Sequence, residues 1–167
     1  GRRRVHKVWR APETSGAELE RLCGSPDHQG VVAEVDPYPY GDAERMLRKP
    51  DALIVALDQV QDPRNLGAVC RSAESAGAAG LVIPERRAAM VTPVACKTSA
   101  GAVEHLEVAH VRNLADWLAA AKAAGFWIWG ADADGDAAPW GVDLTGPTVL
   151  VLGGEGKGLR PRVAAGC

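Results

Sequence analysis

The sequence lacks the marks of several broad classes of protein. It has no apolar run near the length of a membrane span, and we expect no signal peptide and no membrane partner, which makes the cytoplasm the expected location. Its four cysteines form no CxxC pair and no zinc-ligand spacing, so they are expected to be small buried residues of a reducing compartment. Its net charge is only −2, so RNA binding would require a local basic patch.

What the sequence does contain is enough apolar material for a packed domain. The apolar fraction is 47% over 167 residues, which predicts one main domain with an appendage. A cluster of basic residues near the start is one candidate patch, and an ordinary charged terminus explains it equally well. Its members are Arg2, Arg3, Arg4, Lys7 and Arg10.

Residues 52–84 have the pattern strand, loop, helix, strand. Residues 53–57 are an apolar run of the length of a buried strand, and Asp62 before Pro63 predicts a helix start. A second strand is expected at 81–83. Such a βαβ unit implies parallel strands, and the chemistry of parallel sheets lies beyond the carboxyl ends of the strands.

The remaining pattern extends this unit into an α/β fold, a mostly parallel sheet flanked by helices. Further helices are predicted to begin after Asp42, Thr92 and Asn113. Further strands are predicted at 31–35, 105–111, 126–130 and 148–152. A strand within residues 1–10 and one short helix are expected before them.

An acidic run at residues 132–136 invites a calcium interpretation, which fails on spacing. A calcium loop that starts at Asp132 needs glycine at its sixth place and glutamate at its twelfth, where Ala137 and Asp143 stand. We therefore predict a solvated loop and no metal site.

Four segments carry a resemblance to a known family, the SpoU (TrmH-like) branch of the SPOUT RNA methyltransferases. The first match resembles motif 1 of that family. Its residues are Asp62, Pro63, Asn65, Gly67, Arg71, Ala73 and Gly77. The second, LVLGGEGKGL at 150–159, resembles motif 2. KTSAGAVE at 97–104 and HQGVVAEVDPYPY at 28–40 are also similar, and the last is most like RlmB-type enzymes that act on guanosine of 23S ribosomal RNA.

The glycine-rich turn at residues 153–158 does not fit the common nucleotide-binding motifs. A P-loop requires Ser or Thr where Gly158 stands, and the dinucleotide fingerprint requires glycine where Leu159 stands. What remains is backbone that a ligand can approach closely, with the Glu155 carboxylate in its middle. That suits a neutral or cationic group such as S-adenosylmethionine.

The resemblance implies transfer of a methyl group from S-adenosylmethionine to a ribose 2′-hydroxyl of guanosine in large-subunit ribosomal RNA. It also implies a fold with a C-terminal trefoil knot and a homodimer whose sites borrow residues from the partner. Arg71 is expected to activate the hydroxyl, with Asn65 and Glu155 arranging it. The cofactor is expected to lie against Leu152, Gly153, Gly154 and Gly158.

The same resemblance divides the chain into three parts. Residues 1–36 would be a remnant of an N-terminal RNA-binding domain, 37–50 a linker and 51–167 the methyltransferase domain. Motif 3 of the family is expected beyond Cys167, which would leave the knot incomplete.

Two other interpretations remain open at this point. The catalytic motifs would serve equally for transfer RNA, and a non-catalytic RNA-binding module is the third possibility. Taken singly, an Asn at a helix start and an Arg farther along are more often a cap and a solvated side chain.

Overall fold

The computed structural model describes residues 3–135 and 137–167, and the chain forms two compact units. The first unit ends at Pro39 and the second is Tyr40–Cys167. No helix in the described ranges combines the length and the apolar content needed to cross a bilayer.

The first unit is a small antiparallel hairpin with one helix. β1 (Val5–Arg10) pairs with β2 (Val31–Val35), and α1 (Gly16–Cys23) lies between them in sequence. The hydroxyl of Ser15 accepts a hydrogen bond from the Glu18 amide, which caps the start of α1. Arg2 of the predicted basic patch lies outside the described residues.

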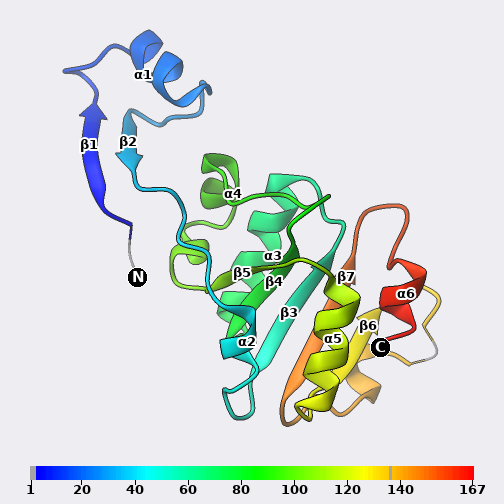
Figure 1. Cartoon of the computed structure of the whole chain (residues 1–167). Helices are drawn as coiled ribbons and strands as arrows, with labels where there is room; N and C mark the ends of the chain where they lie inside the picture. The colour runs from blue at the N-terminus through cyan, green and yellow to red at the C-terminus, as the bar shows by residue number, and fades with distance from the viewer. Residues whose placement is uncertain (1–2, 136) are drawn as a thin grey trace. The chain divides into compact units, whose positions relative to one another are not determined.

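The second unit is built on a five-stranded parallel sheet (Figure 1). Its strand order is β5-β4-β3-β7-β6, so the predicted βαβ unit supplies the central strand and one of its neighbours. The strands are β3 (Leu53–Asp58), β4 (Gly80–Pro84), β5 (Val108–Val111), β6 (Trp127–Ala131) and β7 (Thr148–Gly153). The predicted mostly parallel α/β sheet is confirmed.

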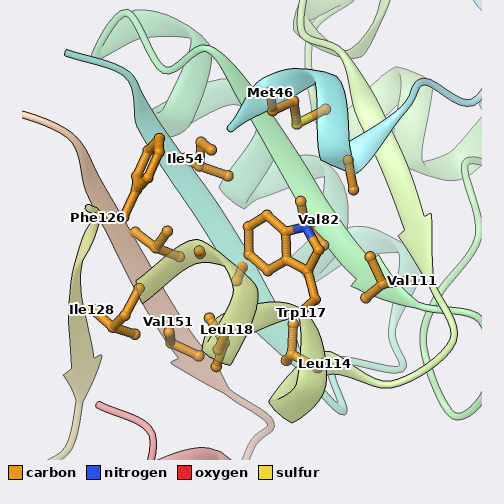
Figure 2. Packing of buried hydrophobic residues seen from close by; sticks show 14 of the residues in the cluster. Met46, Ile54, Val82, Val111, Leu114, Trp117, Leu118, Phe126, Ile128 and Val151 are labelled. Atoms are coloured by element: carbon orange, nitrogen blue, oxygen red, sulfur yellow. The ribbon is translucent and has the colours of Figure 1, made fainter. Parts of the chain in front are cut away.

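Helices cover both faces of this sheet. One face carries α5 (Leu114–Ala123), α2 (Ala43–Met46) and α6 (Pro161–Ala164). The opposite face carries α3 (Pro63–Ser75), and both α4 (Pro93–Thr98) and a 3₁₀ turn, η1 (Ala102–Glu104), pack against α3 (Figure 1). Figure 2 shows how Trp117 and Leu118 of α5 pack on Val82 and Val151 of the sheet. Burial of these side chains fixes α5 on its face.

Two predicted helix starts are confirmed by their capping hydrogen bonds. The Asp62 carboxylate accepts from the Arg64 amide at 2.7 Å, and Pro63 is the first residue of α3. Asn113 Oδ1 accepts from the Ala115 amide at 3.1 Å at the start of α5. Both caps border the carboxyl edge of the sheet, the edge at which ligands generally bind in open α/β sheets.

One predicted strand is too long. The prediction gave a strand over 105–111, but β5 begins only at Val108 and the chain before it turns through η1. The amides of His105 and Leu106 both donate to the carbonyl of Ala102, which closes that turn. Leu106 is buried because the turn packs it inward. An apolar residue at this position therefore gives the same alternation of apolar and polar residues that a strand would give.

Candidate active site

A pocket of about 790 Å³ opens where β3 and β7 end. Its wall combines the loop after β3, the first turns of α3 and the glycine-rich turn after β7. The lining residues are Gln59, Val60, Gln61, Asp62, Asn65, Ala68, Val69, Arg87, Leu152, Gly153, Gly154, Glu155, Lys157 and Gly158. Six of the seven residues predicted for the site therefore lie in one pocket.

The glycine-rich turn folds back on itself in a way that requires glycine. The amide of Gly158 donates to the carbonyl of Gly154 at 3.1 Å, and Gly156 and Gly158 have φ of 75° and 59°. A Cβ on Gly153 would lie 2.5 Å from the Gly158 oxygen, and one on Gly154 would lie 2.6 Å from the Gln59 oxygen. The prediction explained these glycines by a close ligand, whereas the nearest atoms are backbone atoms of this chain.

An ion pair between Asp58 and Arg160 fastens this turn to the sheet. Asp58, the last residue of β3, has no exposed surface. Its carboxylate accepts from the Arg160 backbone amide at 2.8 Å and from Arg160 Nε at 2.7 Å. The sequence analysis missed both residues, although an aspartate that ends a wholly apolar strand was a usable signal. The pair fixes the far end of the turn and hence the shape of the pocket.

A side-chain hydrogen bond joins the two predicted motifs across the pocket. Asn65 Nδ2 donates to Glu155 Oε1 at 2.5 Å, although the two residues are 90 positions apart. Asn65 belongs to the first turn of α3 and Glu155 to the glycine-rich turn. The structure thus brings together two groups that the sequence could only assign to separate motifs.

Arg71 lies outside this pocket. It is six residues after Asn65 on α3, which is about 600° of helix and leaves the two side chains about 120° apart around the axis. The side chain of Arg71 is exposed and is not among the lining residues. The arrangement therefore does not bring Arg71 to the pocket of its own chain.

The pocket suits a ligand that is part apolar and carries charges of both signs. Val60, Val69 and Leu152 supply apolar wall. The charged lining residues are Asp62, Glu155, Arg87 and Lys157. S-adenosylmethionine matches these properties, since its adenine is planar, its sulfonium and amino groups are positive and its carboxylate is negative.

Two other chemistries find little support near the pocket. Burial raises the pKa of the Cys70 thiol to about 12, so this cysteine of α3 stays protonated and is a poor nucleophile. Among residues 3–135 and 137–167, no three His, Cys, Asp or Glu side chains are grouped to hold a metal ion. Asp136 of the acidic run lies outside these residues.

The sequence matches two family models that together cover most of the chain. Residues 52–167 match the model described as the SpoU rRNA Methylase family. Residues 3–41 match the model described as RNA 2′-O ribose methyltransferase substrate binding. A relative from Mycobacterium sp. (strain KMS), described as an uncharacterized tRNA/rRNA methyltransferase, is 44% identical over 160 residues. That match takes in 93% of this chain and 51% of the relative, so the chain spans about half the length of this relative.

Solved structures with the same fold include methyltransferases that contain the methyl donor. The SpoU methyltransferase AviRb from Streptomyces viridochromogenes, in complex with AdoMet, superposes with a TM-score of 0.77 at 27% identity. That match covers 99% of this chain and 72% of AviRb. An AdoMet-bound rRNA methyltransferase from Sinorhizobium meliloti gives a TM-score of 0.78 at 25% identity, over 90% of this chain and 57% of that one.

Proposed function

This chain belongs to the SpoU rRNA methylase family, and from that premise we propose that it transfers a methyl group from S-adenosylmethionine to the ribose 2′-hydroxyl of a guanosine in large-subunit ribosomal RNA. The observation that carries the proposal is the Asn65–Glu155 hydrogen bond. It places the start of α3 and the glycine-rich turn around one pocket that suits the methyl donor. Related proteins with the same fold bind AdoMet, which supports this choice of cofactor.

In this proposal the pocket holds the methyl donor and aligns it with the attacking oxygen. Bound S-adenosylmethionine would supply an electrophilic methyl carbon. Gly153, Gly154 and Gly158 would present backbone to the cofactor, and Leu152 would contact its apolar part. Because methyl transfer requires the hydroxyl, the methyl carbon and the sulfur to lie in line, the residues of this chain would contribute mainly alignment and charge stabilisation. Asn65 and Glu155 are proposed to orient the hydroxyl.

Arg71 is proposed to act on the RNA and not on the cofactor. Arginine hardly deprotonates, so it is a poor general base. Its planar guanidinium can instead donate two hydrogen bonds to a phosphate, or stabilise the negative charge that develops on the attacking oxygen. Since Arg71 is exposed and lies outside the pocket of its own chain, we propose that it reaches the pocket of a partner in a homodimer. Each active site would then combine a glycine-rich turn from one protomer with Arg71 from the other.

The remaining expectations belong to the same proposal. Residues 1–36 would be a remnant of an RNA-binding domain, 37–50 a linker whose helix α2 packs on the sheet, and 51–167 the catalytic domain. The match of residues 3–41 to a substrate-binding model supports the first of these roles. The four free cysteines suit a reducing compartment such as the cytoplasm. The knot implied by the resemblance is retained as part of the proposal.

Transfer RNA is the second candidate substrate. The mycobacterial relative is described as a tRNA/rRNA methyltransferase, which favours neither RNA over the other. Incubating the full chain with methyl-labelled S-adenosylmethionine and with ribosomal or transfer RNA separately tests the choice. We expect label in ribosomal RNA. Label found only in transfer RNA would show that transfer RNA is the substrate and ribosomal RNA is not. Calorimetry with S-adenosylmethionine is the companion measurement, because a chain that binds RNA but no cofactor would be a non-catalytic module.

A further inference from the structure

A second cleft at the same edge of the sheet is surrounded by arginines. It has a volume of about 690 Å³ and lies within the second unit. The loops that follow β4, β5 and the glycine-rich turn contribute four of these side chains, and helix α6 contributes the fifth. The arginines are Arg86, Arg87, Arg112, Arg160 and Arg162. We call this site the arginine cleft.

The positive charge of the arginine cleft is only partly balanced. Arg160 pairs with the buried Asp58, and Arg162 pairs with Asp116, the one carboxylate among the lining residues. Within the described part of the chain, the other three arginines of the cleft have no ion pair within 4.0 Å, and their side chains are exposed. Because the whole chain has a net charge of −2, this concentration of positive charge is local. Like charges held together in this way favour binding of an anion.

The start of α5 adds to the same field. Asn113, which caps this helix, and the next two residues line the arginine cleft. The amino end of a helix carries partial positive charge and free backbone amides, both of which attract anions. Asp116 in the first turn works against this attraction, but it is already engaged by Arg162. The helix end therefore reinforces the arginines and does not define the site alone.

The arginine cleft adjoins the candidate active site. Arg87 lines both the pocket of the glycine-rich turn and the arginine cleft. A strand of RNA whose target ribose enters the pocket would thus carry its neighbouring phosphates along the arginines. Guanidinium groups match phosphate with two parallel hydrogen bonds, which a compact ammonium cannot copy.

We propose that the arginine cleft binds phosphodiester groups of the substrate RNA next to the target nucleotide. The inference rests on the proposed function for the identity of the RNA. It assigns a role to Arg86 and Arg112 that the motifs do not give them. These two are positioning residues, since they hold the strand and do not touch the reacting atoms.

The test compares charge reversals in and outside the arginine cleft. Arg86→Glu and Arg112→Glu change two exposed side chains of the cleft, and Arg48→Glu changes an exposed arginine of the same unit that does not line it. Binding of the full chain to a fluorescently labelled single-stranded fragment of the ribosomal RNA substrate is measured by anisotropy over a range of salt concentrations. Affinity of each variant for S-adenosylmethionine is measured by calorimetry.

We expect Arg86→Glu and Arg112→Glu each to weaken RNA binding about tenfold at low salt, because each removes a charge-assisted hydrogen bond to phosphate. The slope of log affinity against log salt should fall by about 0.7 for each phosphate group that the variant no longer binds. Cofactor affinity should not change, and Arg48→Glu should match the wild type in every assay. This salt slope distinguishes phosphate binding from a merely structural role.

The outcomes separate this inference from the proposed function. If the wild type methylates RNA and both cleft variants keep its affinity and salt slope, the inference is overturned while the function stands. If the cleft variants bind RNA more weakly in a protein that binds no cofactor, the cleft is supported and the proposed function is overturned. If Arg48→Glu weakened RNA binding equally, the effect would be a general one of charge, and the proposed role of the arginine cleft would also be overturned.

Discussion

The two proposed sites at the carboxyl edge of the sheet are built by different means. The pocket of the glycine-rich turn is shaped by backbone, with Gly153 and Gly154 so close to neighbouring chain that a Cβ has no room. The arginine cleft is shaped by long, mostly exposed side chains on three loops and helix α6. The first should be sensitive to added atoms and indifferent to salt, and the second should behave in the opposite way.

The contrast also explains how one edge could serve two ligands. A small ligand buried against rigid backbone gains affinity from fit, because few groups must be ordered when it binds. A polyanion gains affinity from released counterions and tolerates loose geometry. Asp58 and Arg160 lie between the two sites, since the pair fixes the glycine-rich turn and its arginine also lines the cleft.

The largest effect is expected from a substitution that distorts the glycine-rich turn and so the shape of its pocket. Gly153→Val should abolish binding of S-adenosylmethionine and hence methylation, because even its Cβ would lie 2.5 Å from the Gly158 oxygen. Equilibrium dialysis with labelled cofactor measures the loss. Gly141→Ala is the matched control, since a Cβ there meets nothing within 4 Å. Normal cofactor binding by Gly153→Val would place the cofactor site elsewhere.

The next effect separates catalysis from cofactor binding. Arg71→Ala should abolish methylation while leaving cofactor affinity within a few-fold, because Arg71 does not line the pocket of its own chain and is proposed to contact the RNA in the partner's site. Arg71→Lys should also be badly impaired, since a point charge cannot copy a planar fork on phosphate. Single-turnover methylation and calorimetry on the same preparations give both quantities. A variant that failed to bind the cofactor but still bound its RNA would reverse the assignment of Arg71.

A smaller effect concerns the pair between the two sites. Arg160→Ala should lower the free energy of unfolding by about 3 kcal/mol, because it leaves the fully buried Asp58 carboxylate without its main partner. Arg162→Ala, which removes an exposed pair with Asp116, should cost about 0–1 kcal/mol. Urea denaturation of both variants measures the difference. Equal costs would mean that the buried pair contributes no more than a surface one.

The smallest effect is a dependence of stability on pH that comes from His110 and involves none of the arginines. Burial lowers the pKa of His110 below its usual 6.5, against a smaller opposing influence of Glu85. As the pH falls, His110 is therefore protonated in the unfolded chain before it is protonated in the folded chain. The neutral ring makes its full contribution to the free energy of unfolding above pH 6.5, and this contribution decreases as the pH falls below 6.5. His110→Phe keeps a ring to stack on Tyr40 and should flatten this part of the stability curve. Denaturation at several pH values checks it, and an unchanged curve would contradict it.

Many of the helices and strands could be predicted because they depend on local sequence pattern. The apolar run at 53–57 predicts β3, and the capping residues Asp62 and Asn113 predict the starts of α3 and α5, which form as expected. The predicted strand that ends at Val111 is too long, because burial by a turn and burial by a sheet give the same apolar spacing. Local pattern thus identifies elements better than it identifies their ends.

The candidate site was only partly predictable because its contacts are distant in sequence. Motif resemblance named Asn65 and Glu155, but their hydrogen bond spans 90 positions and appears only in the fold. Asp58 and Arg160 are 102 positions apart and were missed. The arginine cleft is assembled from three loops and helix α6, which are distant in sequence, so no single segment predicts it.

The central claim is that this chain methylates a ribose 2′-hydroxyl of RNA from S-adenosylmethionine. Mass spectrometry of nucleosides tests it most directly, using ribosomal RNA incubated with the full chain and the cofactor and then digested completely. We expect a gain of 2′-O-methylguanosine that is absent with Gly153→Val and present with Gly141→Ala. Methylation on a base, or no methylation by a chain that binds both RNA and cofactor, would contradict it.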